Sequence, residues 1–160
     1  MPVQSQVPSR KLSGFTLIEL MIVVAIVGIL GTVAVSIYSS QVTKSRRTDA
    51  RTALLDMAGR QEKIYSTTTA YGTTPFMLGY SSVTTATWPI LVANQYYSVS
   101  VSAPDLSQGA STVPNTFIIT ATAVGQQAGD TQCATLSLNQ LGQQTSTGTG
   151  SVALCWGTGS

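Results

Sequence analysis

An unbroken helical pattern without proline runs from Phe15 to Tyr65, and it limits the folds open to this chain more than any other property. Its first part, Phe15–Tyr38, is apolar except for one acid, Glu19. At about 1.5 Å per residue, a helix over this part is long enough to span a bilayer core of about 30 Å. We therefore expect the segment to lie in a membrane or in another apolar environment.

The second part of the pattern is amphipathic, because its apolar and small residues recur at three-and-four spacing and form one stripe. The stripe consists of Ala50, Ala53, Leu54, Met57, Ala58, Gln61, Ile64 and Tyr65. Asp56 and Arg60 are four residues apart, in the order that favours an ion pair along a helix. The pattern predicts one long helix over about residues 15–65, with the stripe of its C-terminal half packed on a sheet.

After Ser66 the apolar residues alternate with polar ones, which is the period of a β-strand. The predicted strands are Gln95–Ala103, Asn115–Val124 and Thr131–Asn139, with a weaker fourth over Val152–Trp156. Residues 66–94 have no clear period and are expected to form an irregular surface connection. The expected fold class is α+β: a long helix whose C-terminal half packs on a small antiparallel sheet of three or four strands.

Composition argues against an enzyme and against a metal or cofactor site. The chain contains no histidine, which removes the commonest general base and metal ligand, and it shows no clustered carboxylates and no phosphate-cradling glycine loop. We expect no catalytic residues, no bound metal and no cofactor. All eight Lys and Arg lie at or before Lys63, so the Ser- and Thr-rich remainder lacks the cations that phosphate binding requires.

The two cysteines, Cys133 and Cys155, lie close together near the C-terminus. In an exported chain a single pair is typical of a disulfide, whereas two buried thiols would fit a cytosolic protein. The N-terminal segment favours export and hence the disulfide.

The run GFTLIELMIVVAIVGIL, Gly14 to Leu30, closely resembles the N-terminus of type IV prepilins. In that family a membrane peptidase cuts after the glycine and methylates the new N-terminus. The resemblance implies cleavage between Gly14 and Phe15, N-methylation of Phe15, and Glu19 as the fifth residue of the mature chain. Two further runs, Ser45–Tyr65 and Asp130–Gln144, are similar to a group of minor pilins, in which the cysteine pair matches the disulfide that closes the C-terminal loop.

The resemblance also implies an organisation and a set of partners. Residues 1–14 would be a removed leader, residues 15–38 the membrane and filament-core half of the helix, and residues 39–160 the periplasmic, later extracellular, pilin domain. The implied function is that of a minor pilin that supports pilus biogenesis, adhesion or twitching motility. Its partners would be other pilin subunits, the prepilin peptidase and the inner-membrane assembly machinery. The precursor would cross the bacterial inner membrane once and then enter an extracellular pilus.

An ionised Glu19 inside an apolar helix is costly unless it is paired. Cleavage after Gly14 creates an α-amine on Phe15, and in a bundle of such helices this amine can neutralise Glu19 of an adjoining subunit. The alternative is an acid that reaches the membrane interface. The physical argument and the resemblance both favour the pair between Phe15 and Glu19.

Three other interpretations stay open. The first is an ordinary signal peptide cut near Ala34-Val35-Ser36, which would leave the helix up to Tyr65 without its first half. The second is a DNA-receptor pilin of a competence system. Nucleic acid is an unlikely partner, because the candidate basic residues would all lie on the helix. These residues are Lys44, Arg46, Arg47, Arg51, Arg60 and Lys63. The third is a type II secretion pseudopilin, against which the disulfide and the lack of a calcium-ligating acid cluster both count.

Overall fold

The computed structural model describes residues 14–102 and 116–158 and divides the chain into two units, Met1–Ser40 and Gln41–Ser160. One helix, α1, runs from Leu17 to Thr68 and contributes to both units. The long helix expected from the sequence is therefore present. It begins two residues later and ends three residues later than the pattern predicted.

In the N-terminal unit, the large apolar side chains of α1 from Leu17 to Tyr38 are all more than half exposed. By length and composition, α1 is the one helix in the described part of the chain that could cross a membrane. A helix that is apolar all round needs an apolar partner, because water is a poor solvent for it. The partner must come from outside this unit: lipid or other helices.

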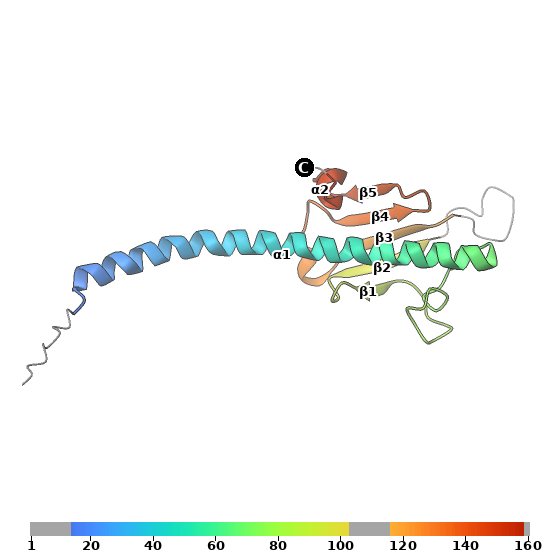
Figure 1. Ribbon diagram of the computed structural model, residues 1–160, viewed down its shortest axis with the longest axis horizontal. Helices are drawn as coiled ribbons and strands as arrows, with labels where there is room; N and C mark the ends of the chain where they lie inside the picture. Colours follow the sequence, from blue (N-terminus) through green and yellow to red (C-terminus); the bar gives the residue numbers. More distant parts are fainter. Residues whose placement is uncertain (1–13, 103–115, 159–160) are drawn as a thin grey trace, which may run out of the picture. The chain divides into compact units, whose positions relative to one another are not determined.

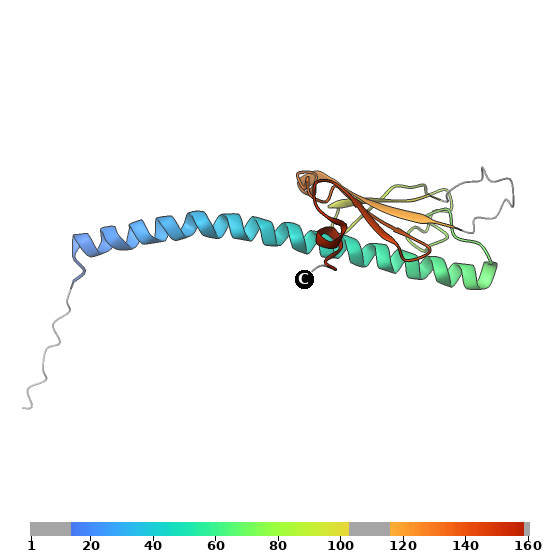
Figure 2. The same cartoon turned by 90° about the horizontal axis from the view of Figure 1, so that it is seen from above.

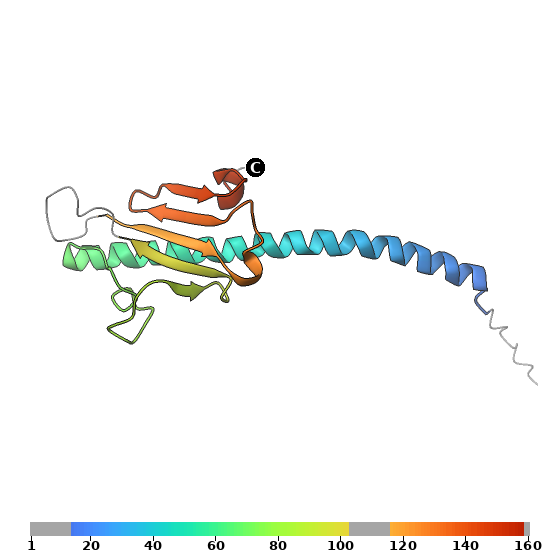
Figure 3. The same cartoon turned by 180° about the vertical axis from the view of Figure 1, so that it is seen from behind.

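The second unit contains a five-stranded antiparallel sheet in the order β1-β2-β3-β4-β5 (Figure 1). The strands are β1 Ile90–Val92, β2 Tyr97–Ser102, β3 Ile118–Ala123, β4 Thr135–Asn139 and β5 Gln144–Thr147. Consecutive strands are neighbours throughout, so the sheet is a simple meander. Figure 3 shows the sheet from the face that α1 does not cover.

The second half of α1 lies along the other face of this sheet (Figure 2). Most of its stripe is buried as predicted: Ala50, Leu54 and Met57 are fully inaccessible and join a core with the inward side chains of the strands. The last residue of the stripe, Tyr65, is 37% exposed. The strand residues of that core are Tyr97, Val99, Ile119, Ala121, Leu136 and Leu138, with Phe117 just before β3. The period-two pattern thus identified the buried face of the three central strands.

The stripe also fixes the chain that follows α1. Gln61 is fully buried, and its side-chain amide donates to the carbonyl of Gly72 at 2.8 Å and accepts from the Gly72 amide at 2.7 Å. A Cβ on Gly72 would lie 2.6 Å from a terminal methyl group of Leu78, so a larger residue here would require the Leu78 side chain to move. Residues 69–80 form only turns and bends, as expected of an irregular connection, but they are held against α1 and are not wholly on the surface, because Tyr71, Pro75 and Leu78 are buried.

The sheet has five strands, and the prediction of three or four was wrong in two places. β1 lies inside the stretch expected to be irregular, and with only three residues it is too short to show a period. β5 was missed because Gln144–Thr147 contains no apolar residue to alternate with. The outer ends of two predicted strands, Ala103 and Asn115, lie outside the described residues.

The weak fourth strand predicted over Val152–Trp156 is instead a short helix, α2. Ser151 caps its N-terminus by accepting a hydrogen bond from the Leu154 amide, and Gly157 ends it in the left-handed conformation at φ 67°. These two cap signals flank the segment in the sequence and outweigh its apolar composition. A 3₁₀ turn, η2 Gly125–Gln127, connects β3 to the loop before β4.

Candidate functional site

The predicted processing and assembly residues lie at the start of α1. Thr16 precedes the helix, and its hydroxyl accepts a hydrogen bond from the Glu19 amide at 3.3 Å. Phe15 is 82% exposed. The scissile bond predicted after Gly14 therefore lies just outside the first turn, in backbone that is not helical.

Sequence reasoning overlooked Thr16, although Thr16-Leu17-Ile18-Glu19 has the spacing of a capping box. In that motif a Ser or Thr caps the third helical amide, and a Glu or Gln three residues later complements the cap. An acid in the first turn also interacts favourably with the helix dipole. Glu19 thus has a local role that exists before any filament forms, and a test of the intersubunit pair has to preserve it.

The two cysteines form a disulfide that closes the C-terminal loop around β4, β5 and α2. Cys133 and Cys155 are fully buried, with a Cα–Cα distance of 5.6 Å. Arg51 of α1 donates to the Cys155 carbonyl at 2.7 Å, which attaches this loop to the helix. Gly148 permits the return of the chain, because it has φ 125° and a Cβ there would lie 2.4 Å from the Gln132 carbonyl oxygen.

A buried ion pair lies beside the disulfide. Arg47 donates to both carboxylate oxygens of Asp130 at 2.6 Å, and Asp130 also accepts from Gln127 at 2.9 Å and from the Cys133 amide at 3.2 Å. Burial raises the pKa of Asp130, but the hydrogen bonds and charge of Arg47 outweigh it, so the net shift is downward. This cluster joins α1 to the loop before β4, so Arg47 is a structural residue and not a surface cation.

Three other cations form what we name the basic stripe: Arg46, Arg60 and Lys63. At about 100° per residue they lie within an arc of about 100° on α1, over a length of about 26 Å. The Arg46 guanidinium lies 3.9 Å above the ring of Tyr96, and that of Arg60 lies 4.6 Å from the ring of Tyr80. Sequence reasoning placed these cations on the helix but could not show that tyrosines from distant segments position two of them.

Arg60 is partly neutralised. It donates to Asp56 at 2.9 Å, as the i,i+4 spacing predicted, and to the Leu78 carbonyl at 3.2 Å. A hydrogen bond from Tyr80, and to a lesser extent one from Arg60, lowers the pKa of Asp56, so this acid stays ionised. Of the three cations, Lys63 is exposed to solvent, whereas the charge of Arg60 is partly offset by the carboxylate of Asp56.

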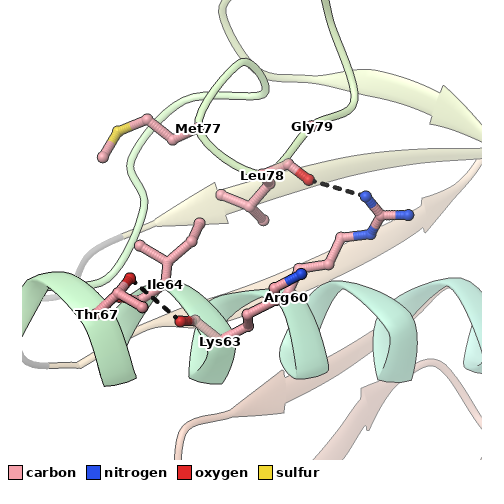
Figure 4. A pocket seen from close by; sticks show the side chains of 7 residues that line it. All are labelled: Arg60, Lys63, Ile64, Thr67, Met77, Leu78 and Gly79. Carbon is pink, nitrogen blue, oxygen red and sulfur yellow. Dashed lines mark hydrogen bonds between the residues drawn. The ribbon is translucent and has the colours of Figure 1, made fainter.

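Arg60 and Lys63 also border a surface hollow of about 280 Å³ between α1 and the segment after it (Figure 4). Its other lining residues are Ile64, Thr67, Met77, Leu78 and Gly79. Figure 4 shows the Arg60 side chain reaching across to the Leu78 carbonyl at one end of this hollow. The hollow has an apolar floor and a cationic rim, and no catalytic constellation is visible among its residues.

Within the described ranges, no group of three or more His, Cys, Asp or Glu side chains could hold a metal ion. The acids are separated: Glu19 lies in the N-terminal unit, Asp130 is paired with Arg47, and Asp56 is paired with Arg60.

Comparison with known proteins gives two matches to protein families. Residues 36–137, well over half of the chain, match the family described as "Type IV minor pilin ComP, DNA uptake sequence receptor". Residues 9–35 match the prokaryotic N-terminal methylation motif. No curated protein matches the chain.

Among solved structures, the chain is similar to a type IV pilin from Shewanella oneidensis, with 25% sequence identity and a TM-score of 0.43. The similarity covers 64% of this chain and 90% of the other.

Proposed function

This chain belongs to the type IV minor pilin ComP family, and on that premise we propose that it is cut after Gly14, methylated on Phe15, and held in the filament by a pair between the Phe15 amine and Glu19 of a neighbouring subunit. The protein is a structural subunit of a type IV pilus, with a membrane-anchored precursor. The proposal adds that the precursor crosses the inner membrane once, that the prepilin peptidase and the assembly machinery are its partners, and that it has no enzymatic activity.

The observation that carries this proposal is the exposure of every large apolar side chain between Leu17 and Tyr38, in a helix that has one acid near its start. The apolar surface requires other helices or lipid around it. Glu19 requires a cation, because an unpaired charge in such surroundings is strongly destabilising. An α-amine is largely protonated at neutral pH, and cleavage after Gly14 provides one four residues away.

The test is Glu19→Gln, a nearly isosteric change that removes the charge. Gln also completes a capping box, so the start of α1 should stay intact. We expect the variant to be processed and held in membranes, while its amount in sheared filaments falls about tenfold or more, the factor that a loss of about 1.4 kcal/mol produces. Glu62→Gln is the matched control, since Glu62 is an exposed acid of the second unit, and it should leave incorporation unchanged. Equal incorporation of Glu19→Gln and wild type would contradict the charge pair.

A second candidate function is DNA capture, because the description of the matching family is that of a DNA uptake sequence receptor. The prediction that nucleic acid is an unlikely partner remains a prediction. The basic stripe is the surface that suits DNA best: it is about 26 Å long, and its guanidiniums are held over tyrosine rings. With only three cations, the slope of log K against log salt should be no steeper than about −2.7.

The DNA test uses the full-length chain in detergent with labelled duplex DNA, at salt from about 50 to about 200 mM. If the stripe binds phosphate, Lys63→Gln should weaken binding and reduce the salt slope by about 0.9. Lys44→Gln is the matched control, because Lys44 is exposed but points about 200° away from Arg46 on the helix. Absence of binding at the lowest salt would remove DNA capture by the isolated subunit and leave the structural role untouched.

A further inference from the structure

The face of the sheet turned away from α1 is covered by serine and threonine side chains in rows. One row runs Ser98–Thr122–Thr135–Thr147 across β2, β3, β4 and β5, and the next runs Ser100–Thr120–Ser137–Thr145. We call the surface made by these residues and Ser102 the hydroxyl face. Two cross-strand hydrogen bonds order it, Thr120 with Ser137 at 3.0 Å and Thr135 with Thr147 at 2.7 Å.

The hydroxyl face is regular because a sheet is regular. Neighbouring strands lie about 4.8 Å apart, and residues i and i+2 on one strand lie about 7 Å apart. The hydroxyl groups therefore form a repeating grid of donors and acceptors. Such a grid suits a partner that itself repeats and that offers hydrogen bonds at many points.

The face is also neutral. After Lys63, the described part of the chain has one side-chain carboxylate, that of Asp130. It is buried and paired with Arg47 of α1, on the helix-covered side of the sheet. A polyanion would find no cation here, which argues against nucleic acid and acidic polysaccharides. A protein interface would be expected to carry aromatic and apolar side chains at its centre. The exposed apolar side chains of this face lie at its margins instead: Leu91 is on the edge strand β1, opposite Ser98, and Ile118 is at the end of β3.

A hollow of about 100 Å³ interrupts the hydroxyl face at the end near the β4–β5 turn. Ile118, which is 36% exposed, gives it an apolar wall. Its polar lining comes from Ser137, Asn139, Gln143 and Thr145. Asn139 is held in place, because it donates to the Gln143 side chain at 2.7 Å and accepts from the Leu141 and Gln143 amides at 3.0 and 2.9 Å.

An apolar wall beside amide and hydroxyl groups matches the two surfaces of a sugar ring, which has C–H groups on its faces and hydroxyls at its edge. The hollow is smaller than the roughly 300–1,000 Å³ of sites that enclose a free small molecule. A single sugar would therefore bind weakly. A chain of sugars that also lay on the rows would gain affinity from many weak contacts made at once.

From the rows, their neutrality and the hollow, we propose that the hydroxyl face binds an uncharged polysaccharide, with one sugar ring in the hollow and the following units across the rows. The pilus subunit would then contact glycan surfaces through a face that neither the helix nor the basic stripe occupies. This inference does not depend on cleavage at Gly14 or on DNA binding.

The test is co-sedimentation of the full-length chain, in a sugar-free detergent, with microcrystalline cellulose, chitin, starch granules and an insoluble β-1,3-glucan. We expect depletion from the supernatant by at least one of these, and no weakening when salt is raised from about 50 to about 200 mM, because no ion pair is involved. Binding to none of the four would overturn the proposal. Binding that salt abolishes would overturn it as well.

Two variants place a long charged side chain on the face: Thr145→Lys at the hollow and Thr122→Lys in the rows. Both positions are exposed, so folding should survive, and the polysaccharide dissociation constant should rise about tenfold. Thr52→Lys makes the same change on an exposed position of α1 and should bind like wild type. The proposal fails if both face variants bind as wild type does, or if Thr52→Lys loses as much binding as they do.

Discussion

At the residue scale, the pair between Arg47 and Asp130 shows how a few side chains hold α1 to the sheet. Both side chains are at most 4% exposed, and the carboxylate accepts hydrogen bonds from Arg47, from Gln127 and from the Cys133 amide. Breaking such a pair leaves an uncompensated buried charge, and this costs about 3–5 kcal/mol. The sequence offered no sign of it, because Arg47 and Asp130 are 83 residues apart and each is ordinary in its own segment.

Asp130→Asn should therefore lower the free energy of unfolding of the second unit by about 3–5 kcal/mol at neutral pH. The folded pKa of Asp130 is depressed, so the pair stabilises at pH above its unfolded value of 3.8 and is lost as pH falls through the lower folded value. Urea unfolding of the full chain at several pH values measures this. The difference between wild type and Asp130→Asn should shrink below about pH 4.

Asp49→Asn, at an exposed position of the same helix, is the control and should change stability by less than about 0.5 kcal/mol. A difference between Asp130→Asn and wild type that stays constant down to the lowest pH would show that the charge of Asp130 is not what stabilises the fold.

At the element scale, two neighbouring leucines of α1 distinguish the contribution of core packing to stability from that of helix propensity. Leu54 is fully buried under the sheet, whereas Leu55 is 55% exposed. Leu54→Ala should cost about 2–5 kcal/mol of unfolding free energy, because it leaves a cavity in the core. Leu55→Ala should cost less than about 1 kcal/mol. Chemical denaturation of both variants checks this, and equal losses would mean that α1 does not pack on the sheet as described.

The disulfide is the second element-scale test. It closes a loop with a sequence separation of 22, and the chain-entropy model gives such a bridge about 3 kcal/mol. The double variant Cys133→Ser, Cys155→Ser should therefore lower the melting temperature by roughly 10 °C for a unit of this size. Thermal unfolding of wild type with and without reductant provides the comparison. An unchanged midpoint in both would show that the loop is held by Arg51 and the core alone.

The elements differ in how well their sequences predict them. Two patterns are long enough to show a period, and both were predicted. They are the apolar stripe of α1, which includes Leu54 and Met57, and the alternation in the strands, which includes Val99 and Ile119. β1 is too short and β5 too polar for a hydrophobic pattern, so pairing with β2 and β4 defines them. The strand predicted at the residues of α2 was wrong, because the cap residues on either side were not weighed against the apolar residues between them.

At the scale of the whole molecule, the chain has one surface for each environment it meets. The apolar surface of α1 up to Tyr38 suits lipid and other helices, the basic stripe suits anions, and the hydroxyl face suits neutral glycans. The proposed processing site of Gly14, Phe15 and Glu19 can be inferred from the sequence alone because its motif is contiguous. The cations of the basic stripe could be placed on the helix from the sequence, but the tyrosines beside two of them could not. The hydroxyl face could not be predicted either, since it depends on which strands the fold brings together.

The central claim is that the mature subunit begins at Phe15 and resides in filaments. Mass spectrometry of the N-terminus, on sheared surface filaments and on membranes separately, tests it most directly. The account predicts a chain that starts at methylated Phe15 in the filament fraction. A chain cut near Ser36, a chain that keeps its leader, or the absence of the protein from filaments would contradict it.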